Sequence, residues 1–118
     1  MVEFNEVVRV DDRFNNTLAG IIIQRLENMG GWCPEQYEGY TVDDRPIYIR
    51  FRSFSLSVHL GHVGQRHREW DLEEQVFAAS IAPRDPNEES DGGCVGLEII
   101  LQVTGLKLSD NFTWYCSV

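Results

Sequence analysis

Strict alternation of apolar and polar residues between Pro46 and Leu60 limits the fold of this chain more than any other feature. Two adjacent runs place apolar side chains at every second position: Ile47, Ile49 and Phe51 in the first, and Phe54, Leu56, Val58 and Leu60 in the second. Such alternation is typical of strands that bury one face. A two-residue turn at Arg52-Ser53 would pair Phe51 with Phe54 and gather the apolar side chains together. The segment is therefore predicted to be a β-hairpin with one apolar and one polar face.

Two details of this hairpin stay open. Arg52-Ser53 is not a favoured pair for a two-residue turn, so a slightly longer or bulged loop is the alternative. Pro46 has no backbone N–H for a ladder hydrogen bond, which favours an edge position. We therefore expect the first strand of the hairpin to begin at an edge of the sheet.

Residues 18–29 have the periodicity of an amphipathic helix. Their apolar side chains recur three, four or seven residues apart, at Leu18, Ile21, Ile22, Leu26 and Met29. Asn15 or Asn16 can cap the first turn, because a short polar side chain accepts a hydrogen bond from the unpaired backbone amides there. Gly30-Gly31 can end the helix in the left-handed conformation. This segment is predicted to be the main helix.

Further strands are predicted where apolar residues alternate with polar ones, over 2–10, 75–82, 95–103 and 112–116. The third of these alternates most strictly. Asp71 and Glu74 resemble a helix capping box, so a helix is the alternative for the second. Glycine, proline and polar residues predict loops over 31–45, 61–70 and 83–93.

Together these segments predict a single α+β domain over residues 1–118. An antiparallel β-sheet would pack one face against the apolar stripe of one main N-terminal helix, because each apolar surface needs a partner. With 118 residues, 42% of them hydrophobic, the chain can bury a core without disulfides or metal ions. Its three widely spaced cysteines indicate reduced thiols. The N-terminus lacks the pattern of a secretory signal, so a cytoplasmic location is expected.

Charge is distributed unevenly along the chain. The net charge is −9, but residues 1–44, 45–68 and 69–118 contribute −6, +5 and −8. The middle segment has five arginines and no acid. The overall negative charge argues against binding to nucleic acid or to an anionic membrane. The basic segment coincides with the predicted hairpin.

The polar face of the hairpin is the first candidate site for binding a partner. Its candidate residues are Tyr48, Arg50, Arg52 and His59. Guanidinium groups form forked contacts with carboxylates and phosphates and stack on aromatic rings, so this face suits an anionic or aromatic surface. The alternative, which we favour from the sequence alone, is that the arginines form ion pairs within the fold.

An acidic loop is the second candidate site for a partner. Its carboxylates are Asp85, Glu88, Glu89 and Asp91. Carboxylates placed where phosphates would lie can occupy the basic groove of a nucleic-acid-binding protein, as in some immunity and anti-defence proteins. The alternative is a loop whose charges are simply solvated.

The three histidines are a further cluster that could bind a metal ion or take part in catalysis. His59, His62 and His67 fall within nine residues, and imidazole is the commonest zinc ligand. Their spacing matches no zinc pattern, so a metal site is a minor alternative and no cofactor is predicted. No phosphate-binding loop, dinucleotide fingerprint or nucleophile elbow is present.

These observations predict a non-enzymatic acidic protein that acts through a charged surface on another protein, as inhibitors, immunity proteins and anti-defence proteins do. One alternative is a small metal-assisted hydrolase or isomerase that uses the three histidines. Another is a structural subunit of a homo-oligomer. No catalytic residue, nucleic-acid contact or membrane contact is expected.

Overall fold

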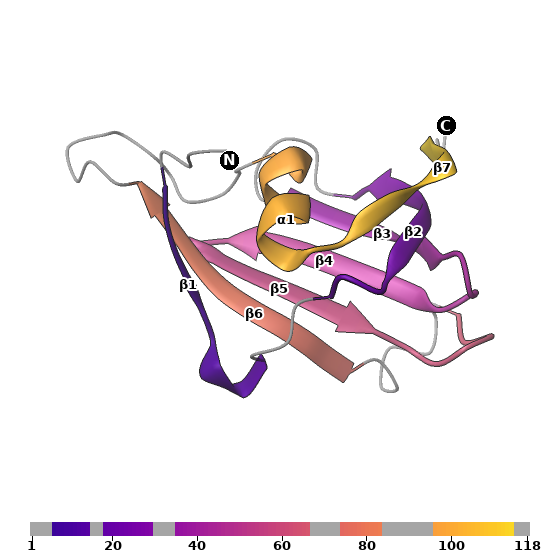
Figure 1. The fold of residues 1–118 in the computed structure, drawn as a ribbon, viewed down its shortest axis with the longest axis horizontal. Helices are drawn as coiled ribbons and strands as arrows, with labels where there is room; N and C mark the ends of the chain where they lie inside the picture. The colour runs from indigo at the N-terminus through magenta and orange to yellow at the C-terminus, as the bar shows by residue number, and fades with distance from the viewer. Residues whose placement is uncertain (1–5, 15–17, 30–34, 67–73, 84–95, 115–118) are drawn as a thin grey trace.

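The computed structural model describes residues 6–14, 18–29, 35–66, 74–83 and 96–114. They form a seven-stranded sheet with one short α-helix and a 3-10 turn (Figure 1). The elements are β1 (Glu6–Val10), η1 (Asp12–Phe14), β2 (Ile22–Asn28), β3 (Glu35–Thr41), β4 (Pro46–Arg52), β5 (Ser55–Leu60), β6 (Glu74–Pro83), α1 (Leu97–Thr104) and β7 (Lys107–Trp114). The strand order is β1-β6-β5-β4-β3-β2-β7, and only the β2–β7 pair is parallel.

The core lies on one face of the sheet, which we call the inner face. α1 and β7 lie over this face, in front of the central strands in Figure 1. Side chains from β4, β5 and β6 cluster there with Ile100 of α1, and each is at most 2% exposed: Ile47, Ile49, Phe51, Leu56, Val58, Phe77 and Ile81. Removing this apolar surface from water is the main force that stabilises the fold.

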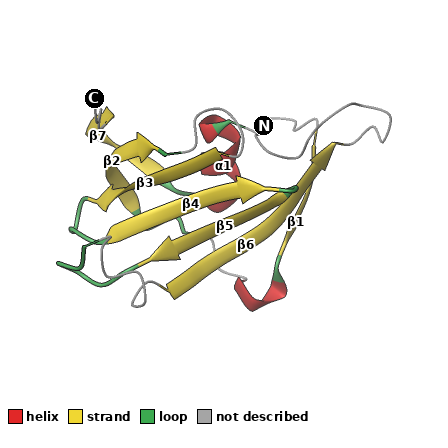
Figure 2. Ribbon diagram, turned by 180° about the vertical axis from the view of Figure 1, so that it is seen from behind, coloured by secondary structure: helices red, strands yellow, loops and turns green. Residues whose placement is uncertain are grey.

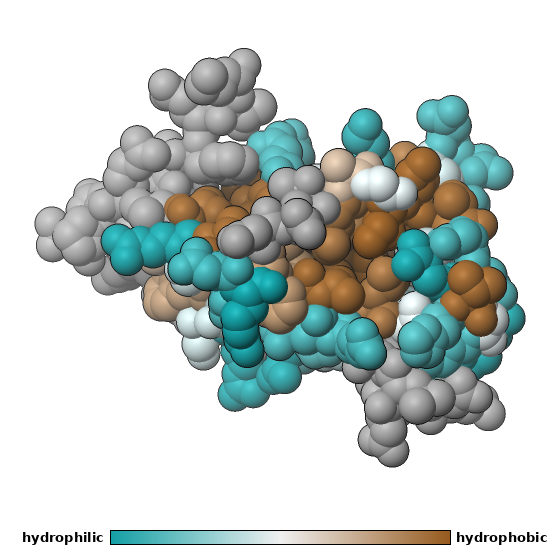
Figure 3. Space-filling view, turned by 60° about the horizontal axis from the view of Figure 1, so that its bottom comes forward, coloured by the Kyte–Doolittle hydropathy of each residue, from teal (hydrophilic) through white to brown (hydrophobic). Residues whose placement is uncertain are grey.

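The core is sealed less completely near the edge strands. Figure 3 shows hydrophobic atoms gathered in a band at the surface, between hydrophilic margins. Half-buried apolar side chains border the core, among them Val8 of β1 and Phe112 of β7. Val10 of β1 is 42% exposed and Trp114 of β7 is 53% exposed. Burial is therefore greatest on the central strands and declines toward both edges.

The predicted N-terminal helix over 18–29 is wrong, because most of this segment forms strand β2. The fully buried side chains of β2 are Ile23 and Leu26, which stand three residues apart. A strand normally buries every second residue, but a register irregularity between Ile23 and Arg25 adds one position. This bulge produces the three-residue spacing of a helix. The β-branched run at 21–23 was the signal that favoured a strand.

The predicted strand over 95–103 is also wrong, because the described part of this segment lies in helix α1. Apolar residues alternate along it, but the fully buried side chains are Ile100 and Thr104, which stand four residues apart. Gly105 ends the helix with a φ of 83°, and its N–H donates to the carbonyl oxygen of Leu101. The fold is therefore a mixed, mostly β structure with a helix late in the chain, instead of an antiparallel sheet with an N-terminal helix.

The predicted hairpin is confirmed as strands β4 and β5, but its turn lies elsewhere. Arg52 pairs with Ser55, so the turn residues are Ser53 and Phe54. Their φ angles are 52° and 63°, and a type I′ hairpin turn requires positive φ at both central positions. The register differs from the predicted one by two residues, so the other apolar side chains of the hairpin still face the core, but Phe54 lies in the turn instead of on the apolar face.

The edge position predicted from Pro46 is wrong, because β4 lies between β3 and β5. Pro46 is the first residue of its strand, a position that tolerates proline. Its carbonyl oxygen accepts the N–H of Gly61 at 2.9 Å. β3 itself occupies residues 35–41 of the predicted loop over 31–45.

Other predicted segments agree with the structure in their described parts. The strands over 2–10 and 75–82 are confirmed as β1 and β6. The last strand, β7, begins at Lys107, ahead of the predicted strand over 112–116. The sheet is thus built from the predicted strands other than 95–103, together with β2 and β3, which sequence reasoning assigned to a helix and a loop.

A buried carboxylate joins strand β3 to the start of α1. Glu35 is 4% exposed and accepts the hydroxyl of Tyr37 at 2.7 Å and the N–H of Gly96 at 2.6 Å. Gly96 is the N-cap residue of α1 and has no side chain that could cap the helix. Glu35 therefore supplies the negative group that a helix N-terminus favours. Burial and the contact with Glu35 raise the pKa of Tyr37, which keeps its hydroxyl a donor.

We expect Glu35→Ala to destabilise the protein. The substitution leaves the buried hydroxyl of Tyr37 without its acceptor, at a cost of about 1–3 kcal/mol, and removes the partner of the Gly96 N–H at the start of α1. Urea denaturation measures this change in the free energy of unfolding. Glu74→Ala, which removes an exposed carboxylate at the start of β6, is the matched control. Equal midpoints for the two variants would contradict the link between β3 and α1.

We expect Gly39→Ala to destabilise the protein through the bulge in β2. A Cβ at Gly39 would lie 1.8 Å from the carbonyl oxygen of Arg25, so the paired backbones would have to separate. The expected loss in the free energy of unfolding is about 3 kcal/mol. Gly20→Ala is the control, because nothing lies within 4 Å of a Cβ there. If thermal unfolding finds Gly39→Ala as stable as Gly20→Ala, the close approach of β2 and β3 is wrong.

Candidate functional site

The candidate residues of the hairpin lie together on the face of the sheet opposite the core, which we call the outer face. Phe51 and its neighbours point inward, so Tyr48, Arg50 and Arg52 of β4 point outward. His59 of β5 is directly opposite Tyr48 in the register. Figure 2 views the sheet from this side, and no other described element lies in front of β4, β5 and β6. The structure thus brings all four predicted residues to one surface.

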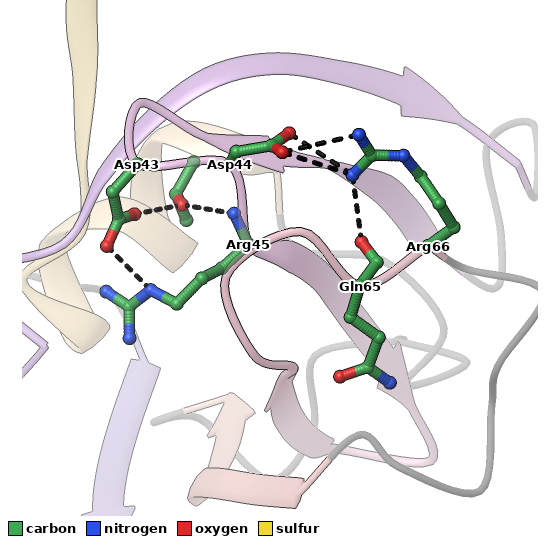
Figure 4. A network of polar contacts seen from close by, with 6 residues as sticks. Asp43, Asp44, Arg45, Gln65 and Arg66 are labelled. Carbon is green, nitrogen blue, oxygen red and sulfur yellow. Dashed lines mark hydrogen bonds and ion pairs between the residues drawn. The ribbon is translucent and has the colours of Figure 1, made fainter.

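Two arginines of the basic segment form ion pairs at the turn between β3 and β4 (Figure 4). Arg45 Nε lies 2.8 Å from Asp43 Oδ2, and Arg66 Nη1 lies 3.2 Å from Asp44 Oδ1. Arg66 also donates to the carbonyl oxygen of Gln65 at 3.1 Å. These two arginines fit the ion-pair alternative, because their acceptors belong to the same chain.

The hydroxyl of Thr41 organises the same turn. It donates to the carboxylate of Asp43 and accepts the backbone N–H of Arg45 at 3.1 Å. The hydrogen bond from Thr41, with help from Arg45, holds the pKa of Asp43 below its usual value. Asp44 adopts a φ of 63°, which places its carboxylate toward Arg66. The ion pairs of Arg45 and Arg66 are therefore part of the local structure of this turn.

Arg50 and Arg52 differ from those arginines, because neither forms an ion pair with a residue that the structure describes. Arg52 is exposed and Arg50 is half-buried. The Nε of Arg50 is shielded from solvent and donates to no acceptor among the residues that the structure describes. A shielded donor without an acceptor costs about 1–3 kcal/mol. The guanidinium of Arg50 is therefore presented with unused hydrogen-bonding capacity.

An aromatic pair borders the two arginines. The ring centroids of Tyr48 and His59 lie 6.0 Å apart with an interplanar angle of 59°. The hydroxyl of Tyr48 donates to Gln36 Oε1 at 3.1 Å. Burial lowers the pKa of His59, and its shielded Nδ1 has no hydrogen-bond partner among the described residues. At neutral pH the imidazole is therefore uncharged, and the positive charge of this group comes from Arg50 and Arg52.

The outer face carries further arginines that sequence reasoning missed. Arg25 of β2 lies over the ring of Tyr40 at 4.8 Å, with Arg66 at 5.3 Å from the same ring. Arg9 of β1 pairs with Ser80 of β6, which places it on the outer face as well. Alternation along residues 2–10 could have given the face of Arg9, but no local signal shows which strand lies beside β1. Only the sheet order brings it to the hairpin.

The remaining candidates lie partly or wholly beyond the described residues. The acidic loop with Asp85, Glu88, Glu89 and Asp91 falls outside them, as do His67 and all three cysteines. His59 lies on the outer face of β5, whereas His62 lies in the exposed segment that follows that strand. Across the described ranges, no three histidine, cysteine, aspartate or glutamate side chains are grouped so that they could hold a metal ion.

Two further observations bear on function. Within the residues that the structure describes, no helix has the length and apolar character needed to cross a membrane. Comparison with protein-family models, with curated proteins and with solved structures finds no match to this chain. The function must therefore be argued from the chemistry of the outer face itself.

The half-buried imidazole of His59 predicts a specific dependence of stability on pH. Because the pKa of folded His59 lies below its ordinary value of 6.5, the unfolded chain binds the proton more readily. Stability that depends on neutral His59 is present above about pH 6.5 and is lost as the pH falls. We expect His59→Gln to lose less stability than the wild type between about pH 7 and pH 5.

His62→Gln is the control for this measurement, since it changes an exposed histidine. It should keep the pH dependence of the wild type in thermal unfolding. If His59→Gln also keeps that dependence, the fold does not lower the pKa of His59.

Proposed function

We propose that this protein is a non-enzymatic binding domain that acts on another protein through the outer face of the β4–β5 hairpin. The binding residues are Tyr48, Arg50, Arg52 and His59, which we call the hairpin patch. One observation carries the proposal: Arg50 and Arg52 have no ion-pair partner among the described residues, although Arg45 and Arg66 of the same basic segment do.

The composition of the hairpin patch suits protein recognition. Arginine and tyrosine are enriched among the residues that contribute most to protein interfaces, because each combines a large contact area with directed hydrogen bonds. The patch has both, and its tyrosine is held in place by Gln36. Because Arg50 has no ion-pair partner among the described residues, the N–H groups of its guanidinium other than the shielded Nε can meet a partner carboxylate or carbonyl group. These N–H groups favour binding over a purely structural role.

The charge of the whole chain favours a protein partner over a nucleic acid. A net charge of −9 repels a polyphosphate at long range, whereas it repels a protein only according to that protein's own charge. The type of protein we propose is an inhibitor, immunity or anti-defence protein, which blocks its partner by covering a surface. We place this activity in the cytoplasm, since an odd set of widely spaced cysteines suits a reducing compartment.

Site-specific photo-cross-linking in the source cells tests the proposal. A benzophenone amino acid replaces Ser55, an exposed residue opposite Arg52. We expect a discrete protein adduct that disappears with the double substitution Arg50→Ala and Arg52→Ala. The adduct should persist with Lys107→Ala, which removes an exposed positive charge from β7.

A second position serves as the control for the cross-linker. The same amino acid at Thr113, an exposed residue of β7, should not give that adduct. Circular dichroism and thermal unfolding verify that each variant is folded. No adduct at Ser55, or an adduct insensitive to loss of both hairpin arginines, would show that the hairpin patch is not the binding surface.

A further inference from the structure

Three arginines surround a floor of small side chains on the outer face. Arg52 pairs with Ser55, Ser55 with Ser80, and Ser80 with Arg9, so these residues form one row across four strands. The adjacent row runs from Arg50 through Ser57 to Ala78. We call the three arginines with these four small residues the arginine frame.

The charge inside the arginine frame is of one sign. None of its positions is acidic, and Arg9, like Arg50 and Arg52, forms no ion pair with a residue in the described ranges. The outer-face carboxylates Glu27 and Glu38 lie on β2 and β3, on the far side of β4. Asp11 continues the second row beyond Ala78, whose carbonyl oxygen accepts its N–H at 2.8 Å, but the carboxylate of Asp11 is paired with Arg13. Three uncompensated guanidinium groups in a chain of net charge −9 make this a local positive surface.

The small side chains leave room for a ligand between the arginines. Arg52 and Arg9 lie on strands three spacings apart, which is about 14 Å. Between them the sheet carries only Ser55 and Ser80 in one row, both of which are exposed. An extended chain can therefore lie along the strands over this floor, with arginines on both sides.

The spacing of the two arginines on β4 indicates how far apart the negative charges of the ligand should be. Residues two apart on a strand are separated by about 6.7 Å, and carboxylates at alternate positions of an extended peptide repeat at the same interval. Arg50 and Arg52 can thus each meet one carboxylate in forked geometry.

We infer that the arginine frame binds an extended acidic segment of a partner protein, whose alternate carboxylates contact Arg50 and Arg52 while Arg9 attracts it from the other side. The inference rests on the proposed function and deepens it. It names the chemistry of the partner and adds Arg9, a residue of a different strand, to the hairpin patch.

Fluorescence anisotropy with labelled decapeptides tests the inference. One peptide alternates glutamate and serine, and the other has the same composition in the order Glu-Glu-Ser-Ser-Glu-Glu-Ser-Ser-Glu-Ser, in which no two glutamates lie two positions apart. We expect tighter binding of the alternating peptide and weaker binding as the salt concentration rises. Arg50→Ala or Arg52→Ala should weaken binding about tenfold, as expected for loss of a charge-assisted hydrogen bond. Arg9→Ala should weaken it about threefold, as expected for an exposed pair.

Matched variants distinguish the effect of forked arginine–carboxylate contacts on affinity from the effect of net charge. Lys107→Ala, which removes an exposed lysine from β7, changes the net charge by the same amount and should bind the alternating peptide as the wild type does. Arg50→Lys keeps the charge but should bind more weakly, because an ammonium group cannot form the fork. Ser57→Glu places a carboxylate inside the arginine frame and should abolish binding, whereas Thr113→Glu on β7 should leave it unchanged.

Several outcomes would overturn the inference. Equal affinity for the two peptides, or full binding by Arg50→Ala, would show that the arginine frame does not read alternate carboxylates. If a uridine decanucleotide binds more tightly than the alternating peptide, the arginine frame is a nucleic-acid site instead. A dimer in sedimentation that dissociates with Arg50→Ala would assign it to a second copy of the chain. If cross-linking at Ser55 captures a partner but no acidic peptide binds, the inference fails while the proposed function stands.

Discussion

Burial of one face of the central strands is the constraint on which the rest of this structure depends. The inward side chains of β4, β5 and β6 are removed almost entirely from water, and a strand that buries every second residue must present the others on the opposite side. The outer face is therefore a consequence of the core. Arg50 cannot leave the outer face without moving Phe51 or Ile49 out of the core.

The same constraint explains why the outer face carries polar and small residues over several strands. Arg50 and Ser57 lie opposite each other because Ile49 and Phe51 meet Val58 and Leu56 on the other side of the hairpin. A rigid, two-faced sheet holds such residues at fixed intervals without ordering loops. This arrangement suits recognition of a repeating ligand. Folding of the core already orders the backbone that carries these residues, so binding does not have to order it again.

A second constraint places the helix. α1 has only eight residues, so its own hydrogen bonds cannot stabilise it in isolation. It is held by Ile100 in the core, by the carboxylate of Glu35 at its first turn and by the N–H of Leu18, which donates to Thr104 at 2.8 Å. Each of these contacts comes from a distant part of the chain. The helix therefore depends on the completed sheet.

Sequence reasoning succeeded where the buried residues of a segment recur at one constant spacing. It failed where tertiary structure changes that spacing. The hairpin was found because alternation through Ile49, Phe51 and Val58 is uninterrupted, and the error in its turn preserved the faces. β2 was misassigned because a bulge separates its buried residues by three positions. α1 was misassigned because its half-buried apolar residues alternate while its fully buried ones do not. Neither the bulge nor the packing of a short helix is visible in local spacing.

The sequence by itself determined the polar face of the hairpin and with it Tyr48, Arg50, Arg52 and His59. Successive residues of a strand point to opposite faces, so local alternation alone assigns each residue to a face. Only the tertiary structure decided which arginines of the basic segment keep their charge uncompensated. Asp43 and Asp44 capture Arg45 and Arg66 through a turn whose geometry depends on Thr41 and on a positive φ. Only the sheet order brings Arg9 beside Ser80, because strand neighbours far apart in sequence are chosen by packing of the whole core.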